Sequence, residues 1–294
     1  FFDIPEDIKE KVSGSMLKNE IYSFQLAGKG DDDEEEQDNV FEIPELDIRF
    51  LDKPSLAMEQ CKNVAVKMAY TSREALVASM TLIEQFTIEK YDEVIEKENI
   101  VDIYEDKLAS YMIKVSSNTL SEADSKQLSL LLHLISDFER ISDYAVNIAQ
   151  AARKMMRKEL DFSKKAIAEL DTFAKLINDI LSISIEAFEN NDKELATCVE
   201  PMEEVADKLN KEIKKRHVKR LRKGKCSVDM GFILSDITSG YERIADHCSN
   251  IAVGIIQVGE EGYESHEYLE HLDKGKDTEF YKKYSVYKEK YSLS

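Results

Sequence analysis

An eleven-residue acidic segment occurs twice in this chain, and the duplication constrains the fold more than any other feature. The segment ERISDYAVNIA spans Glu139–Ala149, and ERIADHCSNIA spans Glu242–Ala252, 103 positions later. A second landmark, the E-x-x-x-D pair at Glu98–Asp102, recurs 105 positions later at Glu203–Asp207. Two independent landmarks with nearly the same spacing indicate an internal duplication, in which each half folds as the same unit.

The residues around these landmarks favour helix. Only 10 glycines and 4 prolines occur among the 294 residues, so few positions interrupt a helix. From Pro54 onward, apolar residues recur at three- and four-residue spacing, which is the period of an amphipathic helix. We therefore predict six long helices, joined by short loops and packed as antiparallel bundles. The first begins at Pro54, and the others cover 89–115, 121–156, 164–189, 192–222 and 227–258.

The predicted fold is all-α, with two tandem three-helix bundles between an irregular N-terminal segment and a short helical C-terminal tail. Residues 1–53 form the N-terminal segment, in which the like-charged run within 28–39 is typical of a flexible acidic linker. The two repeats cover 54–160 and 161–258. In the Tyr-rich tail, 259–294, tyrosines recur at helical spacing, which favours docking on the chain's own bundle and leaves a partner surface as the alternative.

Composition excludes several classes of protein. A net charge of −19 argues against nucleic-acid binding, which needs a basic surface. The four cysteines are far apart and form no CxxC pair, so we expect neither a disulfide framework nor a zinc knuckle, and we expect a reducing compartment. No apolar stretch approaches the roughly 20 residues of a membrane-spanning helix. Phosphate-binding glycine loops and activated nucleophiles are also missing, so we predict that the chain is not an enzyme.

The duplicated acids suggest a binding site for cations. Residues four apart share one face of a helix, so each E-x-x-x-D pair presents two carboxylates together. If the second and third helices of each repeat lie side by side, four carboxylates converge and need protons, basic partners or cations to offset their repulsion. Carboxylate oxygens suit Mg²⁺, Mn²⁺, iron or Ca²⁺. The candidate metal ligands are Glu98, Asp102, Glu139 and Asp143 in the first repeat, and Glu203, Asp207, Glu242 and Asp246 in the second.

Other residues near the motif have two interpretations each. Arg140 and Arg243 either form salt bridges with the motif acids or stand beside a metal site. Asn147 and Asn250 either ligate or hydrogen-bond across the bundle. The basic stretch Lys214–Lys225 either complements the dipole of its helix or contacts an anionic surface such as a membrane leaflet or an acidic partner loop.

Through the two copies of the acidic segment, Glu139–Ala149 and Glu242–Ala252, the chain resembles the PhoU family from about Pro54 to Val258. The resemblance implies two three-helix bundles and a role in phosphate uptake and phosphate signalling. It also implies that the eight carboxylates named above match motifs that bind iron or zinc clusters in some members. The flanks, Leu46–Gln60 and the tail that includes His266–Leu269, are similar to the cytoplasmic C-terminal region of bacterial Na⁺/phosphate cotransporter-related proteins.

The resemblance leads us to expect a cytosolic regulatory domain of a Na⁺/phosphate cotransporter-type protein, on the cytoplasmic side of a prokaryotic cell membrane. It would modulate phosphate transport or signalling, with Fe, Zn, Mn or Mg as the candidate metals. Its expected partner is a membrane transport domain preceding it in the same polypeptide, since the chain begins with Phe1 in place of Met. A homodimer is an open alternative. The alternative functions are a carboxylate-bridged metal enzyme and a purely structural helical scaffold.

Overall fold

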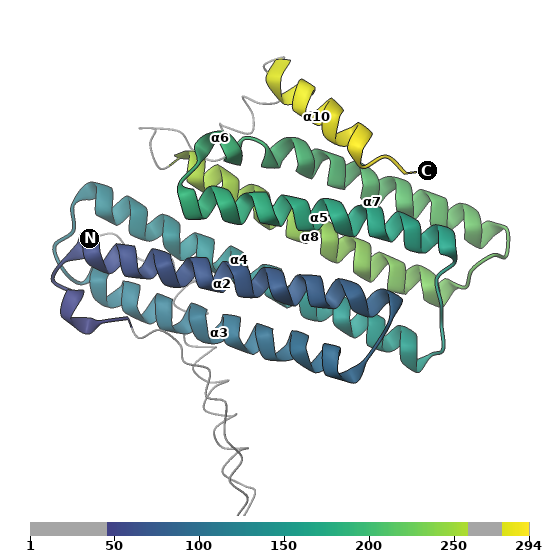
Figure 1. Cartoon of the computed structure of the whole chain (residues 1–294), viewed down its shortest axis with the longest axis horizontal. Helices are drawn as coiled ribbons and strands as arrows, with labels where there is room; N and C mark the ends of the chain where they lie inside the picture. Colours follow the sequence, from purple (N-terminus) through teal and green to yellow (C-terminus); the bar gives the residue numbers. More distant parts are fainter. Residues whose placement is uncertain (1–45, 258–277, 294) are drawn as a thin grey trace, which may run out of the picture.

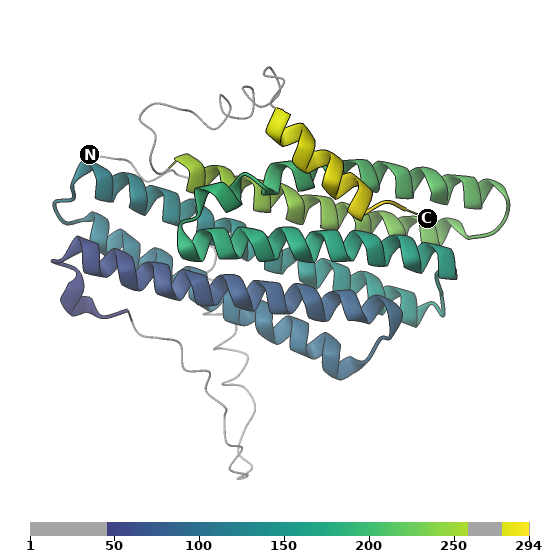
Figure 2. The ribbon, with the colours of Figure 1, turned by 45° about the horizontal axis from the view of Figure 1, so that its top comes forward.

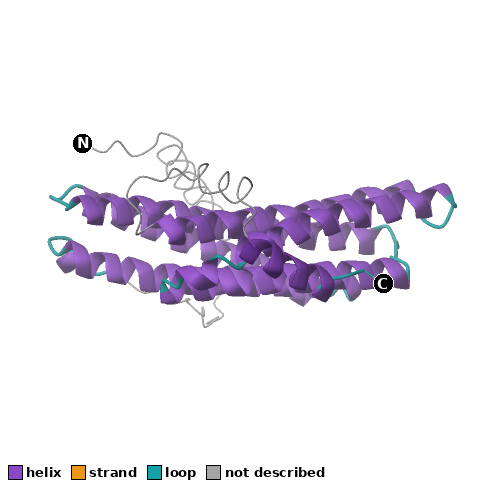
Figure 3. Cartoon of the chain, turned by 90° about the horizontal axis from the view of Figure 1, so that it is seen from above, coloured by secondary structure: helices purple, strands orange, loops and turns teal. Residues whose placement is uncertain are grey.

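The computed structural model describes residues 46–257 and 278–293, and the regular structure within these ranges is entirely helical (Figure 3). The predicted all-α fold of two tandem three-helix bundles is confirmed, and the bundles lie side by side along their length (Figure 1). Within the described ranges, none of the helices combines the length and apolar character needed to cross a membrane. The first bundle contains α2 (Pro54–Glu84), α3 (Ile88–Ser116) and α4 (Glu122–Arg157), and the second contains α5 (Lys164–Asn190), α7 (Val199–Arg222) and α8 (Val228–Gln257).

Capping residues mark the ends of several helices. The side chain of Ser121 accepts a hydrogen bond from the backbone N–H of Asp124 and starts α4. Ser163 starts α5 in the same way, with the N–H of Ala166 as donor. After α7, Gly224 has a φ of 63°, a left-handed conformation that glycine adopts without a steric cost. The predicted start of a helix at residue 121 and the predicted end of another at residue 222 are therefore confirmed.

The prediction of one continuous helix over 192–222 is wrong. The chain forms a short helix, α6 (Lys193–Ala196), then a turn, and α7 begins only at Val199. The physical reason is Pro201, which has no N–H to donate to the carbonyl four residues earlier and whose ring would clash with that carbonyl. In the first turn of α7 the proline is tolerated, because the N–H groups there have no partner within the helix.

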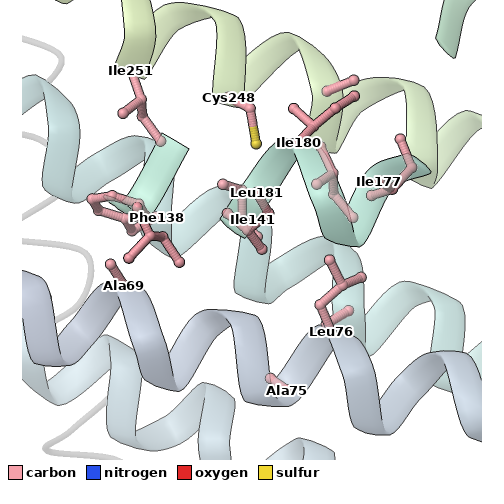
Figure 4. Packing of buried hydrophobic residues seen from close by; sticks show 14 of the residues in the cluster. Ala69, Ala75, Leu76, Phe138, Ile141, Ile177, Ile180, Leu181, Cys248 and Ile251 are labelled. Atoms are coloured by element: carbon pink, nitrogen blue, oxygen red, sulfur yellow. The ribbon is translucent and has the colours of Figure 1, made fainter. Parts of the chain in front are cut away.

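The core continues from one bundle into the other, as the close view in Figure 4 shows. Ala69 of α2 and Phe138 of α4 face Leu181 of α5 and Cys248 of α8, and all four side chains are fully buried. The ring of Phe138 also lies 5.5 Å from that of Phe188 of α5. Burying one large apolar side chain contributes about 1.5–3 kcal/mol, so this shared core joins the two repeats into one platform for the acidic faces.

Segments on both sides of the repeats pack against them. Before α2, the short helix η1 (Ile48–Phe50) is anchored where the hydroxyl of Tyr111 donates to the carbonyl of Asp47 at 2.8 Å. The C-terminal helix α10 (Thr278–Lys290) lies across α7 (Figure 2), which confirms that the tail docks on its own bundle. The tyrosines that recur along this tail are only partly buried: the side chain of Tyr291 is 1% exposed, whereas that of Tyr281 is 52% exposed. The predicted acidic linker lies outside the described residues.

Candidate metal centre

The acids of the second repeat converge where α7 packs against α8. Glu203 and Asp207 are one turn apart on α7, and Glu242 and Asp246 are one turn apart on the neighbouring α8. All four side chains are half-buried. They are close enough that Asp207 and Asp246 both act on Glu203 and on Glu242 electrostatically. The structure therefore brings the four predicted carboxylates of this repeat together.

This crowding changes the protonation of the cluster. Burial raises the pKa of Glu203 to about 8, and the charges of neighbouring carboxylates, Glu200 first among them, act in the same direction. Burial also raises the pKa of Glu242 and that of Asp246, and Asp207 adds to both effects. At neutral pH, Glu203 therefore retains a proton in a place where a bound cation would otherwise offset the repulsion.

Basic and amide groups supply part of the compensation. Lys211 Nζ lies 2.7 Å from Asp207 Oδ2, and Arg243 Nη1 lies 3.3 Å from Asp246 Oδ2. Both are pairs within one helix, so Arg243 makes its salt bridge along α8 rather than across the bundle. Asn210 of α7 links the two helices, because its Nδ2 donates to Glu242 Oε2 of α8 at 2.7 Å.

Glu200 is a fifth carboxylate of this cluster and was not predicted from the sequence. It precedes Glu203 by three residues on α7, and Ser249 of α8 donates a hydrogen bond to its Oε2 at 2.5 Å. Burial raises the pKa of Glu200, although the bond from Ser249 opposes the shift. At the repeat spacings of 105 and 103, the counterparts in the first repeat are Ile95 and Val146. A search for repeated acids cannot find this pair, but the E-x-x-E spacing on α7 could have indicated it.

The acids of the first repeat lie on adjacent helices as well. Glu98 and Asp102 are on α3, Glu139 and Asp143 are on α4, and all four are half-buried. Arg140 lies between the two acids of α4, at 3.7 Å from Glu139 Oε2 and 3.6 Å from Asp143 Oδ2. As in the second repeat, the arginine of the motif forms its salt bridges along its own helix.

The contact between the two repeats uses the other polar residues of the motif. His247 Nδ1 lies 2.8 Å from Asp137 Oδ1, and its ring lies 5.8 Å from that of Tyr144, its counterpart in the first repeat. Asn250 Nδ2 donates to the same oxygen of Asp137 at 3.4 Å, so this asparagine hydrogen-bonds across the protein. The adjacent Cys248 faces the core, where burial raises the pKa of its thiol to about 12. His247 and Cys248 are therefore not a catalytic pair.

The donor chemistry of the second-repeat cluster fits a metal ion, but the side chains are not already arranged around one. Five carboxylates offer hard oxygen ligands of the kind that Mg²⁺, Mn²⁺ and iron accept. In the part of the chain that the structure describes, no three Asp, Glu, His or Cys side chains are grouped closely enough to hold a metal ion. Binding would require the cluster to lose the proton on Glu203 and its carboxylates to turn towards one point.

The chain is similar to known proteins in both sequence and structure. A sequence model of the PhoU domain matches residues 65–152 and 170–254, which together are more than half of the chain. The phosphate-specific transport system accessory protein PhoU homolog 1 of Thermotoga maritima is 24% identical over 219 residues, 74% of this chain and 92% of that protein. The PhoU homolog of Aquifex aeolicus is 24% identical over 213 residues, 72% of this chain and 95% of that protein.

Two solved structures share the fold. The crystal structure of PhoU from Pseudomonas aeruginosa superposes with a TM-score of 0.65 at 17% identity, covering 68% of this chain and 95% of that one. The phosphate transport system regulatory protein PhoU from Streptococcus pneumoniae gives a TM-score of 0.64 at 17% identity, with 72% and 100% covered. At this level of identity the superpositions support the fold alone.

Proposed function

The chain belongs to the PhoU family, and on this premise we propose that it is a regulatory, non-enzymatic protein of phosphate transport. The observation that carries the proposal is that the family match includes both repeats and the acidic motif in each. Sequence relatives from two organisms carry names that assign them to a phosphate-specific transport system. The non-enzymatic part rests on the sequence, which has none of the phosphate-binding glycine loops and nucleophile motifs typical of enzymes.

We further propose that the acidic faces bind a divalent or trivalent metal such as Fe, Zn, Mn or Mg. In the second repeat the ligands would be Glu203, Asp207, Glu242 and Asp246. The bound cation would supply positive charge that offsets the repulsion between the carboxylates. The raised pKa of Glu203 supports the proposal, because a carboxylate that is costly to ionise through burial and through its acidic neighbours is stabilised by a nearby cation. In the first repeat the ligands would be Glu98, Asp102, Glu139 and Asp143.

Metal binding at this position would tie α7 to α8. The acids belong to two helices, so a cation shared between them favours the arrangement in which the helices are held together. A ligand shifts a conformational equilibrium only by the difference in its affinity for the two states. The regulatory proposal therefore requires that metal-bound and metal-free protein differ in the surface that α7 and α8 present to a partner.

We also propose that the chain works as the cytoplasmic part of a Na⁺/phosphate cotransporter-type protein, with the transport domain preceding it in the same polypeptide. Support comes from the Leu46–Gln60 flank, which is bound firmly to the first bundle. Asn118 Nδ2 donates to the carbonyl of Leu51 at 3.0 Å, and Tyr111 donates to the carbonyl of Asp47. The flank that carries this resemblance is therefore part of the folded first bundle. Reading the gene upstream of Phe1 tests this part, and an upstream region without hydrophobic spans would reject it.

Metal binding can be tested with protein stripped by a chelator and dialysed against each candidate metal at pH 6 and pH 8. Wild-type protein should retain more metal at pH 8, because protons compete for Glu203 below its pKa of about 8. The double variant Glu203→Gln/Asp246→Asn should lose the metal of the second repeat. Glu96→Gln/Asp92→Asn, at two exposed acids of α3, is the matched control. Equal metal content in all three proteins would reject the site.

The regulatory role needs a separate assay in cells. Phosphate uptake should change when the gene is deleted and should recover when the wild-type gene is restored. Failure of the Glu203→Gln/Asp246→Asn variant to restore regulation would tie the metal site to the function. Recovery with that variant would separate regulation from the metal, and unchanged uptake after deletion would reject the role in phosphate transport.

A further inference from the structure

The hairpin between α7 and α8 forms a projecting tip at one end of the protein. In Figures 1 and 2 the loop that joins these helices extends beyond the ends of the neighbouring helices along the long axis. Gly224, with φ of 63°, makes the turn. Below it the two helices are in close contact, because a Cβ atom at Gly231 would lie 3.0 Å from Nε2 of the buried His217. The tip is thus a rigid, convex helical hairpin.

The structure separates the basic residues of this hairpin into two groups. Arg216 and Arg220 pair with the buried carboxylate of Glu169, at 3.4 and 2.7 Å, and Lys214 Nζ donates to Ser239 Oγ at 3.0 Å. The charged groups of these three residues therefore make polar contacts within the second bundle. The second group consists of four exposed basic residues at the tip, which form no salt bridge with any residue that the structure describes. They are Lys219, Arg222, Lys223 and Lys225.

Exposed apolar side chains lie among these cations. Val228 is 60% exposed and Phe232 is 61% exposed on the first turns of α8, and Val218 is 45% exposed near the end of α7. Asp229, which adjoins Val228, is paired with Lys158 of α4 at 2.8 Å, and the exposed Asp236 lies one turn after Phe232. A chain with a net charge of −19 therefore has one end where several exposed cations lie close in the chain to exposed apolar groups. Such a combination is typical of surfaces that enter the interface of an anionic membrane.

We propose that this tip binds the anionic surface of a lipid bilayer, with Val228 and Phe232 among the headgroups and the four exposed cations on lipid phosphates. The exposed cations complement the negative charge of an anionic leaflet, and binding to such a planar, fluid surface requires only opposite charge and a few apolar contacts. The inference goes beyond the proposed function, since it requires neither a bound metal nor phosphate transport. Binding through this tip would place the long axis of the bundles at a steep angle to the membrane plane.

Flotation of the full chain with lipid vesicles tests the electrostatic part. Vesicles of 70% phosphatidylcholine and 30% phosphatidylglycerol should bind the protein, vesicles of phosphatidylcholine alone should not, and high salt should weaken the binding. Each basic residue near an anionic surface contributes a factor of about 5 in affinity, so Lys219→Gln/Lys223→Gln/Lys225→Gln should bind roughly 100-fold more weakly. The control removes the same charge from exposed positions of the first bundle, as Lys107→Gln/Lys114→Gln/Lys126→Gln.

The absence of tryptophan from the chain provides a second test of insertion. Phe232→Trp places a single tryptophan at the tip, and its emission, excited selectively, should shift to shorter wavelength on anionic vesicles. Tyr281→Trp, at a residue of α10 that is 52% exposed, should show no shift. Equal binding to neutral and anionic vesicles, or wild-type binding by the triple variant of the tip, would overturn the proposal. Binding to soluble polyglutamate without binding to vesicles would also overturn it and would assign the tip to an acidic protein segment.

Discussion

Replacing Glu203 with glutamine is expected to raise the thermal stability of the metal-free protein at pH 8 and to change it little at pH 5. In the folded protein the pKa of Glu203 is about 8, whereas its ordinary value is 4.5. Between these two pH values the folded state binds more protons at this side chain than the unfolded state does. Stability is therefore highest below pH 4.5 and falls as pH rises through this window. Glutamine carries no ionisable proton, so it removes this penalty.

The magnitude follows from the two pKa values. At 1.36 kcal/mol per pKa unit, the raised pKa of Glu203 costs the folded state about 1 kcal/mol at pH 5 and about 4 kcal/mol at pH 8. For a chain of this size, 1 kcal/mol corresponds to roughly 2–4 °C in the melting temperature. The variant should melt roughly 8–16 °C above the wild type at pH 8. Glu200, Glu242 and Asp246 have raised pKa values too, but they remain in both proteins and largely cancel in the difference.

The assay is thermal unfolding followed by circular dichroism at 222 nm, with a chelator present, at intervals from pH 5 to pH 8. The exposed Glu96 of α3 provides the control, because Glu96→Gln should leave the difference from wild type constant over the whole range. A Glu203→Gln curve parallel to that of the wild type would refute the reasoning. Such a result would mean that Glu203 ionises normally and that the acidic face is open to water.

Three further predictions concern the packing of the protein. Arg220→Ala should cost about 2–4 kcal/mol in unfolding experiments, because it leaves the buried Glu169 with a weaker partner, and Glu169→Leu/Arg220→Met should recover most of the loss. Phe138→Ala should cost about 3–5 kcal/mol and broaden the thermal transition, because it opens a cavity where the two bundles share their core. In native protein a thiol reagent should modify the two half-buried cysteines first, while Cys61 and Cys248, whose pKa values burial raises to about 12, react only on unfolding.

Most of the fold could be predicted from local patterns. The spacing of apolar residues located the six long helices, and capping residues such as Ser121 and Ser163 placed their ends, because these signals act within one or two turns of chain. The one incorrect helix resulted from overlooking Pro201, a local signal that was present in the sequence. The exposure of Tyr281 could not be predicted in this way, because it depends on the angle at which α10 crosses α7.

The candidate site was predictable only in part. Duplication identified the eight carboxylates, because a repeated pattern stands out from the many acids of a charged helix surface. It could not identify Glu200, whose partner Ser249 lies on another helix and whose counterpart in the first repeat is apolar. Nor could it show that Arg140 and Arg243 pair along their own helices, since a sequence does not specify side-chain directions.

The sequence by itself determined the duplicated helical architecture and the residue types on its acidic faces, because helix formation and helix faces depend on neighbours three and four residues apart. Only the tertiary structure decided how those acids behave. The packing of α7 on α8 buries Glu203 among other carboxylates and moves its pKa, and no pattern within one helix contains that information. Packing also decided which cations of the 214–225 stretch are occupied by Glu169 and which remain exposed at the tip, because Glu169 is distant in sequence and adjacent only after folding.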